Sequence, residues 1–135
     1  MKNNNIQHAR TCVYTIGYHF VWSTKYRKNV LTGKVEAFLK ILFQAIALEY
    51  GFTIDTMEVM PDHCHLFIVA HPKYSPSIIA KLLKGISARK LFQAFPLLKK
   101  RLWNGHLWNP SYYVGTAGSL SQETIKRYIE EQKTI

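Results

Sequence analysis

The chain has little cysteine and no long apolar run, and these absences exclude two classes of protein. Its two cysteines, Cys12 and Cys64, are too few for the disulfide framework of a small secreted domain. No stretch approaches the ~18 consecutive apolar residues of a membrane-spanning helix. The N-terminal segment is polar, without the apolar region typical of a signal peptide. We therefore expect a reduced, soluble, cytoplasmic protein with no membrane partner.

Acidic residues are also scarce, and a long continuous segment has none. The chain carries 18 Lys and Arg against 8 Asp and Glu, a formal net charge of +10. Between His63 and Gln122 every charged side chain is basic: Lys73, Lys81, Lys84, Arg89, Lys90, Lys99, Lys100 and Arg101. Ordinary surfaces mix the two signs, so this segment predicts one wall of a groove for a polyanion, with nucleic acid as the first candidate. A chance cluster of basic residues is the alternative.

Apolar and aromatic residues are plentiful, which predicts a real core. They make up 47% and 13% of the 135 residues. This composition excludes wholesale disorder, and the length suits one domain of ordinary size. Neither an internal repeat nor an interdomain linker is visible. We expect residues 1–135 to form a single domain.

The spacing of apolar residues predicts an ordered series of strands and helices. Strands are expected at 13–22, 52–60, 63–70 and 111–116, and helices at 34–50 and 76–95. Gly51 should end the first helix, and Gly85 should interrupt the second. This order is the split βαββαβ arrangement of α+β, ferredoxin-like (RRM-like) folds, an antiparallel sheet with both helices on one face.

Finer features of these segments can also be predicted. A basic turn, TKYRKN, follows the first strand, and Pro61-Asp62 should turn the second strand back into the third as a hairpin. Strict alternation would place Phe52, Ile54, Thr56, Glu58 and Met60 on one face of the second strand. Residues 97–110 are expected to be irregular. Gly115 and Gly118 bracket an expected hinge before a last helix over 119–135, where Ser119 to Gln122 fits a capping box.

His63 and His65 are the first candidates for chemistry. Residues two apart in a strand point to the same face, ~6.6 Å apart along its axis. Two neutral imidazoles so placed can bind one cation, since imidazole is the commonest side-chain metal ligand. The alternative is a pair of partly buried histidines bonded to their neighbours, and the spacing alone favours that alternative.

Tyr128 and Gln132 are the second pair. At i and i+4 they share one face of the last helix, ~5–6 Å apart. Tyrosine is a poor nucleophile at its usual pKa of ~10, but a metal that polarises the electrophile makes it useful. The carboxamide oxygen of Gln132 can complete a metal site. The alternative is that Tyr128 packs on the core beside Ile125 and Ile129, and the spacing alone favours that alternative.

Taken together, the two pairs indicate a metal-dependent attack on DNA. Two imidazoles and one carboxamide leave coordination positions for a phosphate oxygen and water. Attack by Tyr128 would give a phosphotyrosine and a 3′-OH, and the reverse attack would rejoin strands without a nucleotide cofactor. The basic segment would hold the DNA backbone. Trp103, Trp108, Tyr112 and Tyr113 could stack on unpaired bases, or equally lie in the core.

Several longer motifs carry a resemblance to a known family. They are HFVWSTKYRKNVL at 19–31, MPDHCHLFI at 60–68, KLLKGISARKLFQAFP at 81–96, LWNPSYYVGTAG at 107–118 and IKRYIEEQ at 125–132. With His63-Cys64-His65 as a His–hydrophobic–His motif, nearly the whole chain resembles the single-tyrosine HUH transposases. These are small TnpA-type proteins of bacterial and archaeal insertion sequences.

The resemblance implies a specific site and reaction. Tyr128 would be the nucleophile, and His63, His65 and Gln132 would bind Mg²⁺ or Mn²⁺. The protein would cut and rejoin single-stranded DNA near hairpin ends through a 5′-phosphotyrosine intermediate. It would act as a homodimer, with the tyrosine helix hinged at Gly115 and Gly118. Cys64, the middle residue of the motif, should point away from the metal and have no direct role.

Two further functions stay open from the sequence. One is a domesticated relative that cuts hairpin repeats without moving an element, and the other is a non-catalytic module that binds single-stranded nucleic acid. A pure binder would need neither the His pair nor the Tyr/Gln helix, so the motifs favour the enzyme. The expected DNA contacts lie in the basic turn and the second helix: Lys25, Arg27, Lys28, Lys81, Lys84, Arg89 and Lys90.

Overall fold

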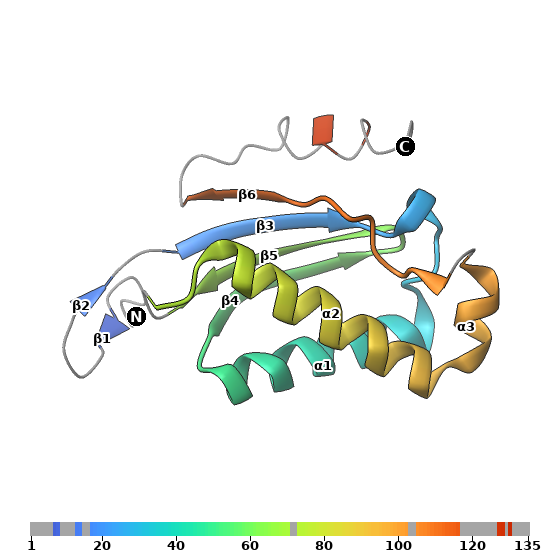
Figure 1. The fold of residues 1–135 in the computed structure, drawn as a ribbon, viewed down its shortest axis with the longest axis horizontal. Helices are drawn as coiled ribbons and strands as arrows, with labels where there is room; N and C mark the ends of the chain where they lie inside the picture. The colour runs from blue at the N-terminus through green and yellow to red at the C-terminus, as the bar shows by residue number, and fades with distance from the viewer. Residues whose placement is uncertain are drawn as a thin grey trace.

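A four-stranded antiparallel sheet organises the computed structural model, which describes residues 7–8, 13–14, 17–70, 73–102, 105–116, 127–128 and 130. Its strands are β3 (Gly17–Ser23), β4 (Thr53–Met60), β5 (His63–Val69) and β6 (Tyr113–Thr116), in the spatial order β4-β5-β3-β6. Two long helices, α1 (Gly33–Tyr50) and α2 (Pro76–Ala94), cover one face of this sheet (Figure 1). The predicted α+β, βαββαβ fold is confirmed.

The core lies between the sheet and the two helices. In β5 the side chains alternate, so that Cys64, Leu66 and Ile68 are fully buried against the helical layer. Trp22 of β3 meets the ring of Phe43 from α1 edge-on, at a centroid distance of 6.0 Å. The other residues of β5, which alternate with these buried ones and include His63 and His65, therefore face the side of the sheet away from the helices.

The first predicted strand is divided between two sheets. Val13–Tyr14 forms β2, which pairs with β1 (Gln7–His8) in a separate two-stranded sheet, and only β3 joins the main sheet. Gly17 opens β3 because a side chain there would collide with the ring of Phe67. A Cβ atom on Gly17 would lie 2.5 Å from Phe67 Cζ.

The expected alternation in the second strand is wrong at its start. A β-bulge between Ile54 and Thr56 shifts the register, so that Ile54 pairs with Ile68 while Glu58 pairs with His65. A bulge inserts one extra residue, which reverses the phase of the side chains. Ile54 therefore joins the core side, and Glu58 lies on the face that carries the histidines.

Two expectations about the helices also need correction. Helix α2 runs without a break through Gly85, because the buried residues on either side, Leu83 and Ser87, hold the helix in place. The low helix propensity of glycine costs only ~1 kcal/mol. Residues 97–110 are not all irregular, since α3 (Pro96–Arg101) begins directly after α2. Proline suits the first turn of a helix and disfavours helical geometry at the preceding residue, so Pro96 ends one helix and starts another. Gly51 ends α1 with φ of 81°, as expected.

The remaining elements frame the site. The basic turn contains a short 3-10 helix, η1 (Lys25–Arg27), and the Pro61-Asp62 turn joins β4 to β5 as predicted. Among the described residues, no helix is long and apolar enough to cross a membrane. Arg127, Tyr128 and Glu130 are helical, whereas the predicted start of that helix, with Ser119, lies outside the described residues.

Candidate active site

Both histidines of the HUH motif project from the face of β5 that the helices leave uncovered. His63 pairs across the sheet with Ser23 on one side and Met60 on the other, and His65 pairs with Val21 and Glu58. Between them, Cys64 is fully buried in the core, and burial raises the pKa of its thiol well above the usual range. The expectation that Cys64 points away from the histidines is confirmed.

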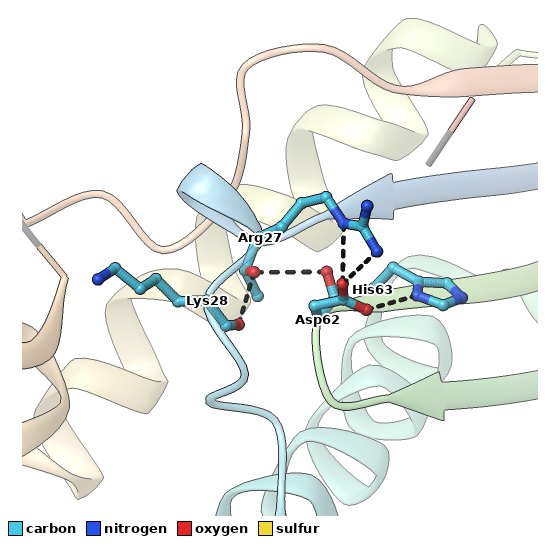
Figure 2. A network of polar contacts seen from close by, with 5 residues as sticks. Arg27, Lys28, Asp62 and His63 are labelled. Atoms are coloured by element: carbon cyan, nitrogen blue, oxygen red, sulfur yellow. Dashed lines mark hydrogen bonds and ion pairs between the residues drawn. The ribbon is translucent and has the colours of Figure 1, made fainter. Parts of the chain in front are cut away.

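His63 is held by a carboxylate that an arginine holds in turn (Figure 2). Its Nδ1 lies 2.8 Å from Asp62 Oδ1, while Arg27 donates to the other oxygen, Oδ2, from Nε at 2.8 Å and Nη2 at 2.7 Å. Burial would raise the pKa of Asp62, but the hydrogen bonds from His63 and Arg27 outweigh it and lower that pKa. Asp62 is therefore an ionised acceptor for both neighbours.

His65 has a different environment, which includes a third histidine. Its Nε2 lies 3.2 Å from Nδ1 of His19 on β3, and its Nδ1 lies 3.7 Å from the largely exposed Glu58 carboxylate. Burial lowers the pKa of His19, and the nearby His65 lowers it further. A neutral His19 can share one proton with His65. While Nε2 of His65 is bonded to His19, that nitrogen cannot also bind a cation.

Tyr128 lies on the same side of the sheet as the two histidines. Its hydroxyl is 3.2 Å from Ser111 Oγ, and its ring stands edge-on to Tyr113 at a centroid distance of 6.4 Å. Tyr113 pairs with Val21, which pairs in turn with His65. Two strand spacings of ~4.8 Å therefore separate β6 from β5 beneath the tyrosine.

The phenol of Tyr128 is protonated in this arrangement. Burial raises its pKa, and the hydrogen bond with Ser111 only partly opposes that effect. Ser111 Oγ donates its proton to Asn109 Oδ1 at 3.0 Å, so the proton between Ser111 and Tyr128 belongs to the phenol. Attack by this oxygen needs a proton acceptor or a strongly polarised phosphate.

Lys84, an expected DNA contact, is instead turned toward the protein. Its ammonium donates to the carbonyl oxygens of Asn109 at 2.7 Å, Ser111 at 3.1 Å and Pro110 at 3.3 Å. Burial lowers the pKa of Lys84 to about 8, an effect that Cys64 partly opposes. All three ammonium protons are thus used to fix the segment that leads into β6 and carries Ser111.

Replacing Lys84 with methionine should lower the free energy of unfolding by about 2 kcal/mol, because three carbonyls lose a charged donor. Chemical denaturation followed by circular dichroism measures this change. Lys81→Met, one turn earlier and exposed, is the matched control and should leave stability within about 0.5 kcal/mol of the wild type. Equal stability of the two variants would contradict the anchoring role of Lys84.

The expected DNA contacts on α2 lie in the helical layer, on the other side of the sheet from the histidines. Lys81 and Arg89 line a shallow groove of about 450 Å³ on the outer side of α2, in the helical layer. Lys90 is exposed on the same helix, and Lys28 is exposed beside η1. The guanidinium of Arg27 forms an ion pair with the Asp62 carboxylate. Of the acid-free segment, Lys81, Arg89 and Lys90 therefore lie on α2 and not beside the histidines.

The aromatic candidates for base stacking divide between core and site. Trp108 is a core residue, packed edge-on against Trp22 and donating from Nε1 to Ser87 Oγ at 2.9 Å. Tyr112 is half-buried against Phe20. Tyr113 remains beside Tyr128, and Trp103 lies outside the described residues.

The donors present fit a divalent cation. The imidazoles of His63 and His65 share one face, and the bond from His63 Nδ1 to Asp62 leaves its Nε2 lone pair for a metal. The described ranges contain no group of three or more His, Cys, Asp or Glu side chains placed to hold a metal. A third ligand must come from elsewhere, and Gln132, the expected one, lies outside the described residues.

Sequence reasoning overlooked three residues of this site. His19, Asp62 and Ser111 contact the predicted ligands and nucleophile. Only Asp62, adjacent to His63, had a local signal. Gly115 lies near the end of β6, paired with His19. Gly118 falls outside the described residues, so the hinge stays a prediction.

Comparison with known proteins identifies the family of this chain. Residues 12–132 match the profile of the family "Transposase IS200 like". The chain is 46% identical to the ISDra2 transposase TnpA of Deinococcus radiodurans over 92% of this chain and 89% of that protein. It is 31% identical to the transposase of insertion sequence IS200 from Salmonella typhimurium, over 86% of this chain and 78% of that one.

Solved structures agree with the sequence relatives. A crystal structure of a transposase from Deinococcus radiodurans superposes with a TM-score of 0.87 at 44% identity, over 93% of this chain and 97% of that one. The fold alone is shared with a REP-associated tyrosine transposase bound to a REP hairpin, with a TM-score of 0.56 at 16% identity over 93% and 67% of the two chains. The chain belongs to the IS200-like transposase family.

Proposed function

We propose that this transposase, an enzyme that cuts and transfers DNA strands, acts on single-stranded DNA next to hairpins through Tyr128. The observation that carries the proposal is the placement of Tyr128 on the face of the sheet that presents His63 and His65. Nothing in the helical core requires either histidine or the tyrosine there. A non-catalytic binding module would have no use for this combination.

The reaction exchanges one ester bond for another. The phenol oxygen of Tyr128 attacks a phosphorus atom of the DNA backbone, the P–O3′ bond breaks, and the 3′ oxygen leaves with a proton as a 3′-OH. The DNA strand then remains attached to the protein as a 5′-phosphotyrosine. Attack by another 3′-OH reverses these bond changes and joins the strands, so no nucleotide cofactor is needed.

The proposed site includes a divalent cation, Mg²⁺ or Mn²⁺, which would supply Lewis-acid polarisation of the phosphate when bound. His63 and His65 would hold it together with Gln132. Asp62 and His19 act on these ligands, because each is hydrogen-bonded to one of the two imidazoles. Neutral imidazoles are the forms that bind metals, and burial and the neighbouring His65 lower the pKa of His19.

DNA binding would use the separated basic surfaces. Lys81 and Arg89 lie in the helical layer, whereas the histidines lie on the opposite face of the sheet. A hairpin held by α2 would therefore send its single strand around the β6 edge toward Tyr128. The hairpin-bound REP-associated transposase, which shares the fold, supports a hairpin as partner. We further propose that the protein acts as a homodimer.

A covalent adduct is the direct test of this function. The protein is incubated with Mg²⁺ and end-labelled single-stranded DNA that contains a hairpin from the ends of its own element. A labelled band of protein size on a denaturing gel is expected. The same sequence as a full duplex is the control and should give no band. Equal adduct from duplex DNA would contradict the single-strand proposal, and absence of any adduct would contradict the phosphotyrosine mechanism.

A further inference from the structure

The neighbourhood of His63 differs from that of His65 in a way that bears on metal binding. Asp62 accepts a bond from His63 through Oδ1 and bonds from Arg27 through Oδ2. Among the described residues, the polar neighbours of His65 are a largely exposed carboxylate at 3.7 Å and an imidazole at 3.2 Å. One ligand is thus fixed by an ionic chain of side chains, and the other is not.

We propose that Arg27 and Asp62 form a positioning pair that holds His63 in the tautomer and orientation required of a metal ligand. An ionised carboxylate only accepts hydrogen bonds, so the proton between Asp62 and His63 is on Nδ1 of the imidazole. The lone pair of a neutral His63 is then on Nε2, the nitrogen that faces away from Asp62. A carboxylate behind a ligating histidine also raises the basicity of the ligand.

Arg27 can hold Asp62 because an unusual turn fixes the arginine. Tyr26 and Arg27 both adopt left-handed backbone angles, with φ of 57° and 53°, which non-glycine residues rarely do. Such strain persists only where surrounding contacts determine it, and it clusters at functional sites. The strained turn brings the guanidinium of Arg27 back over the start of β5 (Figure 2).

Thr24 supplies the contacts that fix this turn. Its hydroxyl donates to the carbonyl of Lys28 at 2.8 Å, and its backbone N–H donates to the carbonyl of Asp62 at 2.9 Å. On the other side of the hairpin turn, the N–H of Leu31 donates to the carbonyl of Pro61 at 2.9 Å. The basic turn and the β4–β5 turn are therefore bound together, and Asp62 cannot move independently of Arg27.

The inference assigns Arg27 a role other than the DNA contact expected from its charge. Its guanidinium is mostly buried, with 19% of the side chain exposed, and it is bonded to a carboxylate that is 14% exposed. An arginine used for phosphate would present its donors to solvent. Arg27 is a positioning residue that acts through Asp62 on His63.

This positioning role rests on the proposed metal site, so the experiment must distinguish a failure of the positioning role from a failure of the metal site. Mn²⁺ binding is titrated by electron paramagnetic resonance in proteins that also carry Tyr128→Phe, which keeps DNA chemistry out of the assay. Asp62→Ala should weaken binding about tenfold to a hundredfold, the range for residues behind metal ligands. Arg27→Gln should weaken it less, and Asp55→Asn, which removes an exposed acid elsewhere on β4, should leave it unchanged.

A double-mutant cycle distinguishes positioning from general charge. In a His63→Ala background, Asp62→Ala should cause no further loss, because its effect passes through the ring that is gone. If His63→Ala itself leaves Mn²⁺ binding intact, the proposed metal site is wrong. If His63→Ala weakens binding but Asp62→Ala does not, only the positioning role is wrong.

A second readout needs no metal. A long-range ¹H–¹⁵N spectrum of the metal-free protein with labelled histidine reports which ring nitrogen carries the proton. His63 should show the Nδ1–H tautomer in the wild type and lose it in Asp62→Ala, with the fold checked by the backbone amide spectrum. An Nε2–H tautomer of His63 in the wild type would overturn the inference.

Discussion

Replacing Tyr128 with phenylalanine should abolish DNA cleavage and the covalent adduct while leaving hairpin binding intact. The substitution removes only the oxygen that we propose attacks phosphorus. The phenylalanine ring keeps the edge-on contact with Tyr113. Among the described residues, the contact that the phenylalanine loses is the hydrogen bond to Ser111, worth about 1 kcal/mol.

A gel-based cleavage assay and a hairpin-binding titration measure the two effects separately. Tyr113→Phe is the matched control, since it removes the hydroxyl of the adjacent tyrosine from the same face of the sheet. That variant should keep adduct formation. Cleavage that survives in Tyr128→Phe, or a Tyr113→Phe protein that is equally inactive, would show that the nucleophile has been misidentified.

Removing both imidazoles, with His63→Ala and His65→Ala together, should slow cleavage at least about a thousandfold. Lewis-acid polarisation of a phosphate contributes several kcal/mol, and each 1.36 kcal/mol corresponds to a factor of ten in rate. Both side chains lie on the face of β5 away from the core. Their loss should therefore spare the fold, which circular dichroism checks.

Removing the divalent metal by chelation tests the same site independently, again through the rate of cleavage. Wild-type protein in excess EDTA should fall to the rate of the double variant, and added Mn²⁺ should restore the wild type but not the variant. His106→Ala, which removes an exposed histidine after α3, should behave as wild type throughout. Undiminished cleavage in EDTA would mean that the two histidines serve the reaction without a metal.

The predicted fold was right because its signals are local and repeated. Helix α1 carries an apolar residue every three or four positions and ends at a glycine with φ of 81°, as its sequence requires. The hairpin of β4 and β5 follows from two apolar strands around a Pro-Asp turn. Where prediction failed, at the bulge in β4 and at Gly85 in α2, pairing and packing from other segments overrode local preference.

Some residues of the candidate site could likewise be placed from the sequence, and others could not. His63 and His65 could be placed on one face because a strand alternates strictly, and Cys64 could be placed in the core for the same reason. The fates of Arg27 and Lys84 could not be predicted. In the sequence, Arg27 is one basic residue of a basic turn, and Lys84 is one of an acid-free segment. Arg27 turns inward because it binds a carboxylate 35 residues away. Lys84 turns inward because it binds backbone carbonyls 25 to 27 residues away.

The sequence by itself determined the order of strands and helices, the residues available for chemistry and the excess of positive charge, since each depends on composition or on neighbours along the chain. Only the tertiary structure decided which acidic side chain supports His63, that His19 reaches His65, and that Ser111 holds Tyr128. The His19–His65 contact joins β3 to β5, and the Ser111–Tyr128 contact joins the segment before β6 to the C-terminal helix. Hydrogen bonds across such distances leave no periodic trace in the sequence.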